Sequence, residues 1–440
     1  MRFAKIIGIL MVVLLLSGCA EHTALRPTTD AGHETMGGES VKELTILSYD
    51  AETLARYAAA AQAQYGVQLE FAEPDNSAYD QMLLDFAAGK GTYDIVCIDN
   101  MVGNLYTADG LIDRGYFAPL GGNEQIARAL RSMLPVLQQQ AMRSGEIYAL
   151  PYFVHTKVLE FDRALYTVAQ SGDYEAYTRW CGTEFTREDA EKLPEMREYG
   201  SWQELMDTGA MHKPADKLAP IAMLEQYTLA ADQADFTFDC AEFQSLLELM
   251  KRCELNAQTE ELLPIQITTG GVTLYSENWL DEVNTDDLFL LYEYLFAPPT
   301  ADAQDRLAMS YGVMAINAFS GQKDQALLFL ESAAKIMLEG DPDFDVKKDR
   351  EFPNAVYGSV PTARCFTDEA HLIAVAGNDP ENQKRWLELT QRLAPITNTG
   401  YLTSFYLEIY PMFRDGAITA EQCARMTQER FEIYKAEQGR

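Results

Sequence analysis

Apolar-rich runs of strand length alternate with helix-like stretches after the N-terminal segment. Glu43–Tyr49, Val67–Phe71 and Tyr93–Ile98 have the pattern of buried strands. The stretches between them, Glu52–Gln64 and Tyr79–Ala88, have helix-forming composition and are closely followed by glycine, which favours helices that end there. Because the order is β-α-β-α-β with short connections, the pattern predicts a parallel sheet with right-handed crossovers.

The stretch Gly145–Phe153 marks a change along the chain. A tight turn is expected at Ser144-Gly145, and the apolar run Ile147–Leu150 that follows is broken by Pro151. Proline fixes its own φ, lacks an N–H donor and pushes the preceding residue toward extended geometry. A second strand-like run, His155–Phe161, comes next. We interpret this as an extended segment that bends where the chain crosses from one lobe to a second, with the bend lining a cleft.

The rest of the pattern is mostly helical, with a buried strand at Tyr311–Asn317. Thr167–Arg197 is polar and charged, which is typical of a surface insertion. Ser201 and Glu204 have the spacing of a capping box. Helices are expected over residues 123–140, 242–255, 322–338, 380–393, 403–413 and 420–437.

The N-terminus has the features of an export signal. Arg2 and Lys5 precede an apolar run, Ile6–Leu16, that is too short to span a membrane. The run ends in Leu16-Ser-Gly-Cys19, which resembles the bacterial lipobox. We therefore expect a lipoprotein signal peptide at residues 1–18, a lipid on Cys19, and a flexible tether over residues 19–40. The expected location is the outer face of the cell membrane, extracellular or periplasmic.

Length and charge narrow the possibilities. A chain of 440 residues favours two domains over one. The formal net charge of −32 disfavours nucleic acid as a partner, because its phosphates would be repelled.

Familiar catalytic motifs are absent from the sequence. There is no H-E-x-x-H, no G-x-S-x-G, no P-loop and no C-x-x-C. Gly340–Asp345 begins like a calcium loop, but Val346 replaces the required glycine and Phe352 the terminal glutamate, so an acidic loop is favoured. We expect a protein that is not an enzyme and that has neither a cofactor nor a metal. A disulfide between Cys240 and Cys253 stays open.

Several stretches, in this order, resemble the extracellular solute-binding proteins of ABC importers, family 1, which are maltose-binding-protein-like. Together they span nearly the whole chain behind the lipobox. The stretches are Tyr93-Asp-Ile-Val96, Gly110-Leu-Ile-Asp113, Gly145-Glu-Ile-Tyr-Ala-Leu-Pro151, Phe161-Asp-Arg-Ala-Leu165, Ser201-Trp-Gln-Glu-Leu205, Gly312-Val-Met-Ala-Ile-Asn317 and Gly416-Ala-Ile-Thr-Ala-Glu-Gln422.

This resemblance implies a two-lobed α/β fold of the periplasmic-binding-protein type II kind, with a hinge and an interlobe cleft. The N-terminal lobe would comprise residues 41–151 and 312–358, and the C-terminal lobe residues 152–311 and 359–440. The chain would cross the hinge near residues 150–154, 308–311 and 358–361.

The resemblance also implies a function. The protein would capture a small solute, a sugar or oligosaccharide, by closing its lobes, and would deliver it to the transmembrane subunits of an ABC permease. It would be a monomer held at the membrane by its lipid. A sensor in place of the permease would use the same fold.

Candidate ligand residues follow from position. In open parallel sheets, ligands bind outside the carboxyl ends of the strands. Sugars need planar side chains against their apolar faces and polar groups for their hydroxyls. An aspartate after a strand can equally be a helix cap. Residues at predicted strand ends or crossings that would supply these groups are Tyr49, Asp50, Asp99, Asn100, Tyr152, Trp279, Tyr311 and Tyr357.

Two other classes of function stay open. The acidic charge and acidic strand ends also suit a binding protein for peptides or cationic solutes. A secreted glycoside-acting enzyme would need a pair of carboxylates, and 67 acidic residues are enough to conceal one.

Overall fold

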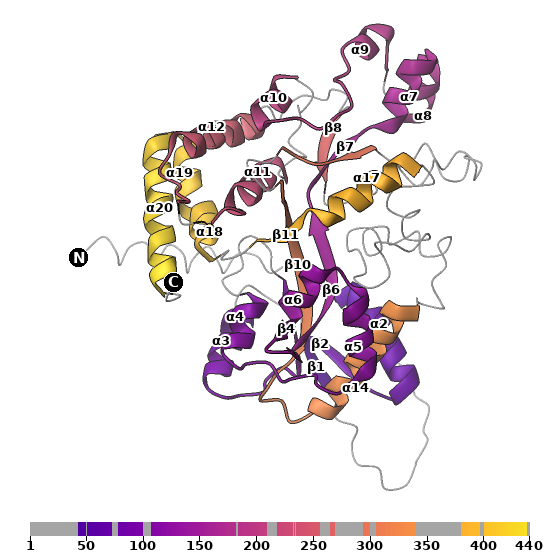
Figure 1. The fold of residues 1–440 in the computed structure, drawn as a ribbon, viewed down its shortest axis with the longest axis vertical. Coiled ribbons are helices and arrows are strands. Elements are labelled where there is room, and N and C mark those ends of the chain that lie inside the picture. The colour runs from indigo at the N-terminus through magenta and orange to yellow at the C-terminus, as the bar shows by residue number, and fades with distance from the viewer. Residues whose placement is uncertain are drawn as a thin grey trace, which may run out of the picture. The chain divides into compact units, whose positions relative to one another are not determined.

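The structure is a computed structural model. It describes residues 43–49, 51–72, 78–99, 107–181, 184–208, 218–231, 233, 235–255, 265–268, 294–299, 305–339, 380–396 and 400–437. Residues 42–440 form one compact unit, whose elements are labelled in Figure 1.

The largest sheet has the strand order β11-β10-β3-β1-β2, with β6 also paired to β10. β1 is parallel to both β2 and β3, as the β-α-β-α-β pattern predicts. The long strand β10 is antiparallel to β3 and β6 and parallel to β11. The strands are β1 (Leu44–Leu47), β2 (Leu69–Ala72), β3 (Ile95–Asp99), β6 (Ala149–Thr156), β10 (Leu307–Ile316) and β11 (Leu393–Pro395).

Helices bury the apolar faces of this sheet and form the first of two large hydrophobic cores. Every residue of β10 is buried, which is why its sequence is almost entirely apolar, with Ser310 as the exception. Helix α14 packs against α2 and α5, and Figure 1 shows these three helices side by side. The helices are α2 (Ala51–Tyr65), α3 (Ala78–Ala87), α4 (Ala108–Asp113), α5 (Glu124–Ser132), α6 (Pro135–Ala141) and α14 (Lys323–Glu339).

The single helix predicted over residues 123–140 is wrong, because Pro135 divides it. Helix α5 ends at Ser132, and Leu134 has an extended ψ of 138°. A proline disfavours helical geometry at the preceding residue, and its own missing N–H suits the first turn of the next helix. Pro135 therefore starts α6.

A hairpin leads into the stretch that the sequence singled out. Strands β4 (Met142–Arg143) and β5 (Glu146–Ile147) pair antiparallel. The two residues between them, Ser144 and Gly145, have φ values of 52° and 85°. Positive φ at both central positions is the geometry of a two-residue hairpin turn, so the tight turn predicted here is confirmed.

A second core lies around a three-stranded sheet with the order β8-β7-β9. Its centre is aromatic: the ring of Phe238 makes edge contacts with those of Phe243, Tyr401 and Phe431. The strands are β7 (Val158–Phe161), β8 (Ile265–Thr268) and β9 (Tyr294–Phe296). The helices of this core are α10 (Trp202–Asp207), α11 (Leu218–Thr228), α12 (Ala241–Leu255), α18 (Gly400–Ser404), the π-helix η3 (Phe405–Ile409), α19 (Tyr410–Arg414) and α20 (Ala420–Glu437). Helix α17 (Pro380–Gln391) packs on β9, while its Leu389 belongs to the first core.

The charged segment predicted as an insertion is folded. Residues 167–197 contain the second half of α7 (Arg163–Ser171) and all of α8 (Tyr174–Cys181) and α9 (Arg187–Glu191), seen at the top of Figure 1. Leu165, Val168, Tyr177 and Phe185 form a small core of their own beneath these helices.

The chain passes from one core to the other just after β6. Val158 belongs to the first core and Leu159 to the second. The chain returns before β10, where Phe296 packs on the second core and Ala297 lies in the first. The predicted lobe boundaries themselves stay a proposal.

The described residues bear on the expectations for membrane spans, metals and disulfides. None of the helices among them is long and apolar enough to cross a membrane. No cluster of metal-ligating side chains is found among them either. Cys240 and Cys253 lie near opposite ends of the α12 region, which leaves them too far apart to form a disulfide with each other.

Candidate functional site

Two of the predicted ligand residues lie at neighbouring strand ends. Tyr49 follows β1, and Asp99 is the last residue of β3, with which β1 pairs in parallel. The carboxyl ends of the two strands therefore present an aromatic ring and a carboxylate at the same edge of the sheet. This is the edge at which ligands bind in open α/β sheets.

Tyr49 is an exposed ring with a buried support. Its side chain is 51% exposed, and it stacks on Tyr79 of α3 with ring centroids 4.7 Å apart and planes 17° from parallel. Tyr79 is buried, and its hydroxyl donates to the carbonyl oxygen of Cys97 at 2.9 Å. That bond fixes the supporting ring, so Tyr49 has a defined orientation.

Asp99 is oriented by β6. The hydroxyl of Tyr152 donates to Asp99 Oδ1 at 3.0 Å. Tyr152 is itself buried, and its ring meets that of Phe153 edge to face with centroids 4.9 Å apart. The structure therefore brings Tyr152 and Asp99 together, with Tyr152 in a position to hold the carboxylate in place.

Close packing beside Asp99 depends on Gly312 of β10. Gly312 lies opposite Asp99 on one side and Phe153 on the other. A Cβ at this position would overlap the Phe153 ring and lie 2.8 Å from Asp99 Oδ1. Only a residue without a side chain permits this approach of three strands.

Tyr311 precedes Gly312 in β10, and successive residues of a strand point to opposite faces of the sheet. Tyr311 is 1% exposed, and its hydroxyl donates to Gln140 Oε1 at 3.0 Å. Burial raises the pKa of Tyr311 well above its ordinary value. We therefore leave Tyr311 out of the site proposed below.

The other predicted residues lie outside the described part of the chain: Asp50, Asn100, Trp279 and Tyr357, and with them the lipidation residue Cys19 and the Gly340–Asp345 loop.

Sequence reasoning did not single out Tyr79 or Gly312 as site residues. Gly312 carried a usable signal, because a glycine inside a buried strand often marks a close approach. Tyr79 carried no such signal, because the sequence of a helix does not indicate which strand end its tyrosine will stack on. Phe153 lay in the stretch that the sequence emphasised, but its contact with Gly312 depends on strand register.

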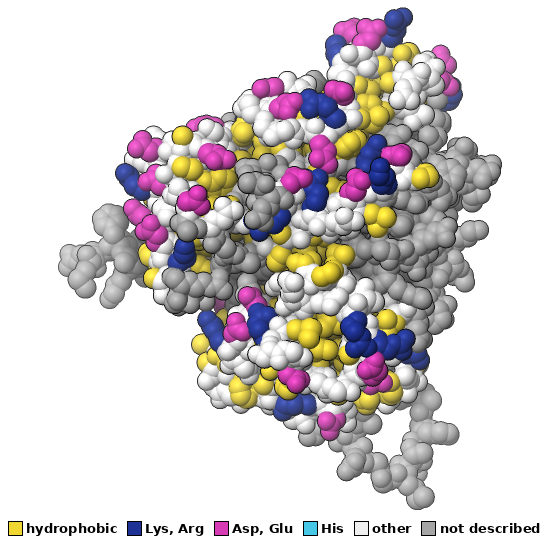
Figure 2. Space-filling view, in the orientation of Figure 1, with side chains coloured by type: hydrophobic (Ala, Val, Ile, Leu, Met, Phe, Trp, Pro, Cys, Tyr) yellow, Lys and Arg dark blue, Asp and Glu magenta, His cyan; other side chains and the backbone are white. Residues whose placement is uncertain are grey.

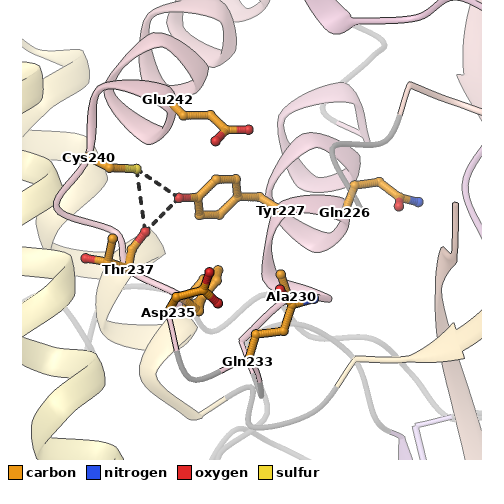
Figure 3. A pocket seen from close by; sticks show the side chains of 9 residues that line it. Gln226, Tyr227, Ala230, Gln233, Asp235, Thr237, Cys240 and Glu242 are labelled. Atoms are coloured by element: carbon orange, nitrogen blue, oxygen red, sulfur yellow. Dashed lines mark hydrogen bonds between the residues drawn. The ribbon is translucent and has the colours of Figure 1, made fainter. Parts of the chain in front are cut away.

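A separate pocket of about 300 Å³ lies at the end of α11 and the start of α12. Figure 3 shows the Tyr227 side chain reaching toward Thr237 and Cys240. Its hydroxyl donates to the carbonyl oxygen of Thr237 at 2.7 Å and lies 3.2 Å from Cys240 Sγ. Burial raises the pKa of Tyr227 well above its ordinary value. The pocket contains none of the predicted ligand residues.

Comparison with solved structures identifies the fold. MalE3 of T. maritima, with maltose bound, aligns with a TM-score of 0.56 at 15% identity, covering 89% of this chain and 99% of that one. UgpB from Mycobacterium tuberculosis, in complex with glycerophosphocholine, aligns with a TM-score of 0.57 at 11% identity, covering 91% and 100%. A solute-binding protein of Agrobacterium vitis with bound D-mannitol has a TM-score of 0.55 at 14% identity, covering 90% and 99%.

This chain has the two-lobed α/β fold of ABC-transporter solute-binding proteins. No protein-family model matches the sequence, and no curated protein matches it. The resemblance inferred from short motifs is thus confirmed at the level of the fold. The solute-binding fold accounts for the long strand β10 and for the passage of the chain between two cores.

Proposed function

We propose that this protein is a lipid-anchored substrate-binding protein of an ABC importer that captures a sugar or oligosaccharide and delivers it to the permease. The observation that carries the proposal is the exposed Tyr49 ring, stacked on Tyr79, beside the Asp99 carboxylate at one sheet edge. An aromatic face suits the apolar side of a sugar, and a carboxylate accepts hydrogen bonds from its hydroxyls.

The solved neighbours support this class of ligand. Three proteins with the same fold are described with maltose, D-mannitol or α-D-tagatose bound. The lipid anchor and the outer face of the membrane rest on the Leu16–Cys19 lipobox. The permease as partner rests on the fold.

Binding can be tested directly with the protein lacking residues 1–40. Isothermal titration calorimetry against maltose, mannitol, tagatose, glycerophosphocholine, a short peptide and spermidine would identify the class of ligand. We expect saturable binding of a sugar that is recovered chemically unchanged. Hydrolysis of a glycoside would contradict a role in binding alone.

Tyr49→Ala should weaken sugar binding roughly tenfold, because the stacking face is lost while the half-exposed side chain contributes little to the core. A matched control is Leu407→Ala, which removes a side chain that is 74% exposed on η3. Both variants should melt near the parent temperature. Equal affinity of Tyr49→Ala and the parent would place the ligand elsewhere.

A cationic solute is the second candidate, favoured by Asp99 and by the net charge of −32. Binding of spermidine with no response to any sugar would select it.

A further inference from the structure

A buried ion pair sits where the chain passes between the two cores. Lys157 is the single residue between β6 and β7. Its Nζ donates to Glu225 Oε1 of α11 at 2.9 Å, and the two side chains are 5% and 2% exposed. Because Val158 packs in the first core and Leu159 in the second, the pair is attached directly to the passing segment.

A buried ion pair holds the two elements that carry it at a fixed separation. Removing two charges from water is unfavourable, and only close contact compensates for it. In the protein interior the attraction falls steeply as the charges separate. Burial raises the pKa of Glu225, and the ammonium of Lys157 opposes that rise. The position of α11 relative to Lys157 is therefore tightly defined.

The last turn of α11 also binds the segment that starts β10. Arg306 Nη2 donates to the carbonyl oxygen of Leu229 at 3.1 Å. The Gln226 amide, oriented to satisfy both neighbours, donates to Arg306 O at 3.2 Å and accepts from Ala308 N at 3.0 Å. Ala308 in turn accepts a hydrogen bond from Thr156 Oγ1 at 2.9 Å. Helix α11 packs against β10, and both are labelled in Figure 1.

A third segment joins at the same place. Leu229, just beyond α11, forms a small apolar cluster with Ala308 of β10 and with Ala394 and Ile396 of the β11 region. From there the chain continues to Tyr401 and Leu402, which belong to the second core. One short stretch, residues 225–229, therefore contacts three segments: the one around residue 157, the start of β10 at residues 306–308, and residues 394–396. At the first and the last of these the chain passes between the two cores.

We propose that residues 225–229 are a clasp that makes these three segments move together, and that the Lys157–Glu225 pair sets the equilibrium between the ligand-free and ligand-bound arrangements. The proposal rests on the proposed function for its ligand, but the clasp itself can be tested without one. With the clasp intact, few arrangements of the cores are populated. Loosening it populates arrangements that do not bind, so apparent affinity falls although no ligand contact changes.

The test is hydrogen exchange measured on the paired variant Lys157→Met with Glu225→Leu. Replacing a buried ion pair by apolar residues of similar volume can preserve folding, whereas removing one partner leaves an unpaired buried charge. We expect amide exchange at residues 157–161 and 306–309 to accelerate about tenfold in the ligand-free protein. Exchange in α14, which lies in the first core, should not change. The matched control removes an exposed pair, Arg131→Met with Glu124→Leu, and should leave both regions unchanged.

A second variant keeps the proposal testable if the paired variant does not fold. Gln226→Met removes the contacts to Arg306 and Ala308 and retains the ion pair, and it should accelerate exchange at residues 306–309. The charge-reversed variant, Lys157→Glu with Glu225→Lys, retains an ion pair. Its amide exchange should therefore be slower than that of the Lys157→Met with Glu225→Leu variant and closer to the parent rate. Unchanged exchange in both the paired variant and Gln226→Met would overturn the clasp.

Affinity separates failure of the clasp from failure of the proposed function. Where a sugar ligand is found, the paired variant should bind it about fivefold more weakly. Accelerated exchange with no ligand found would retain the clasp and reject the function. Unchanged exchange with normal sugar binding would retain the function and reject the clasp.

Discussion

At the scale of single residues, the candidate site depends on a missing side chain as much as on those present. Gly312 lets Phe153 and Asp99 approach the same point of β10 from opposite sides. Tyr152 then reaches Asp99 Oδ1. A carboxylate at a strand end becomes an oriented group because three strands converge beside it.

Gly312→Ala should therefore weaken ligand binding by about tenfold and lower the free energy of unfolding by about 1–3 kcal/mol, because overpacking displaces the Phe153 ring and the Asp99 carboxylate. Calorimetry and urea unfolding would measure the two effects. The control is Gly321→Ala, where an added Cβ meets nothing within 4 Å. In a Phe153→Ala background, Gly312→Ala should cost less stability than it does in the parent, because the ring that clashes is absent. An equal cost in both backgrounds would mean that the clash with Phe153 is not the cause.

At the scale of elements, one carboxylate joins three helices around the first core. Tyr65 at the end of α2 donates to Glu331 Oε1 of α14 at 2.7 Å. Asn123, the N-cap of α5, donates to Glu331 Oε2 at 2.7 Å. Burial, together with the hydrogen bond to Glu331 and its charge, raises the pKa of Tyr65 from 10.0 to about 12.

This network predicts a loss of stability in alkali. Unfolded Tyr65 releases its proton near pH 10, whereas the folded side chain retains it until about pH 12. Between pH 10 and pH 12 the unfolded state therefore binds fewer protons than the folded state. The stability that Tyr65 contributes is complete below pH 10 and is lost as the pH rises toward 12. Tyr65→Phe should cost about 1 kcal/mol at pH 8, and the difference from the parent should shrink with rising pH.

Urea unfolding at a series of pH values would measure the difference in the free energy of unfolding between Tyr65→Phe and the parent. Tyr174→Phe, which removes a hydroxyl from α8 outside this network, is the matched control. A difference between Tyr65→Phe and the parent that stays constant from pH 8 to pH 12 would contradict the assignment.

The elements also show what a sequence can predict and where local pattern stops. Strands β1, β2 and β3 were predictable because short apolar-rich runs that alternate with helix-like stretches have few alternatives. The single helix predicted over residues 123–140 is wrong because Pro135 ends one helix and starts the next. Tyr49 and Asp99 were predictable from the rule that strand ends form sites. The contacts of Tyr79 and Gly312 depend on register and stacking, which no local pattern encodes.

At the scale of the whole molecule, charge is the dominant feature. The formal net charge is −32. In Figure 2 acidic side chains are spread over the viewed face with lysine and arginine between them, so no single patch on that face accounts for the excess. A field of this kind acts at long range, raising the local concentration of cations and leaving neutral solutes unaffected.

The two candidate ligand classes therefore differ in their response to salt. A neutral sugar should associate at the same rate in 20 mM and 500 mM sodium chloride, whereas association of spermidine should slow by about tenfold or more, because added salt shortens the range of the field. Stopped-flow measurement of the intrinsic fluorescence would follow both. Mannitol against spermidine is a suitable pair, since both are flexible and soluble and they differ chiefly in charge. A salt-independent rate for the ligand that binds supports a sugar-type solute. A steep fall would show instead that the acidic surface steers a cation toward the site.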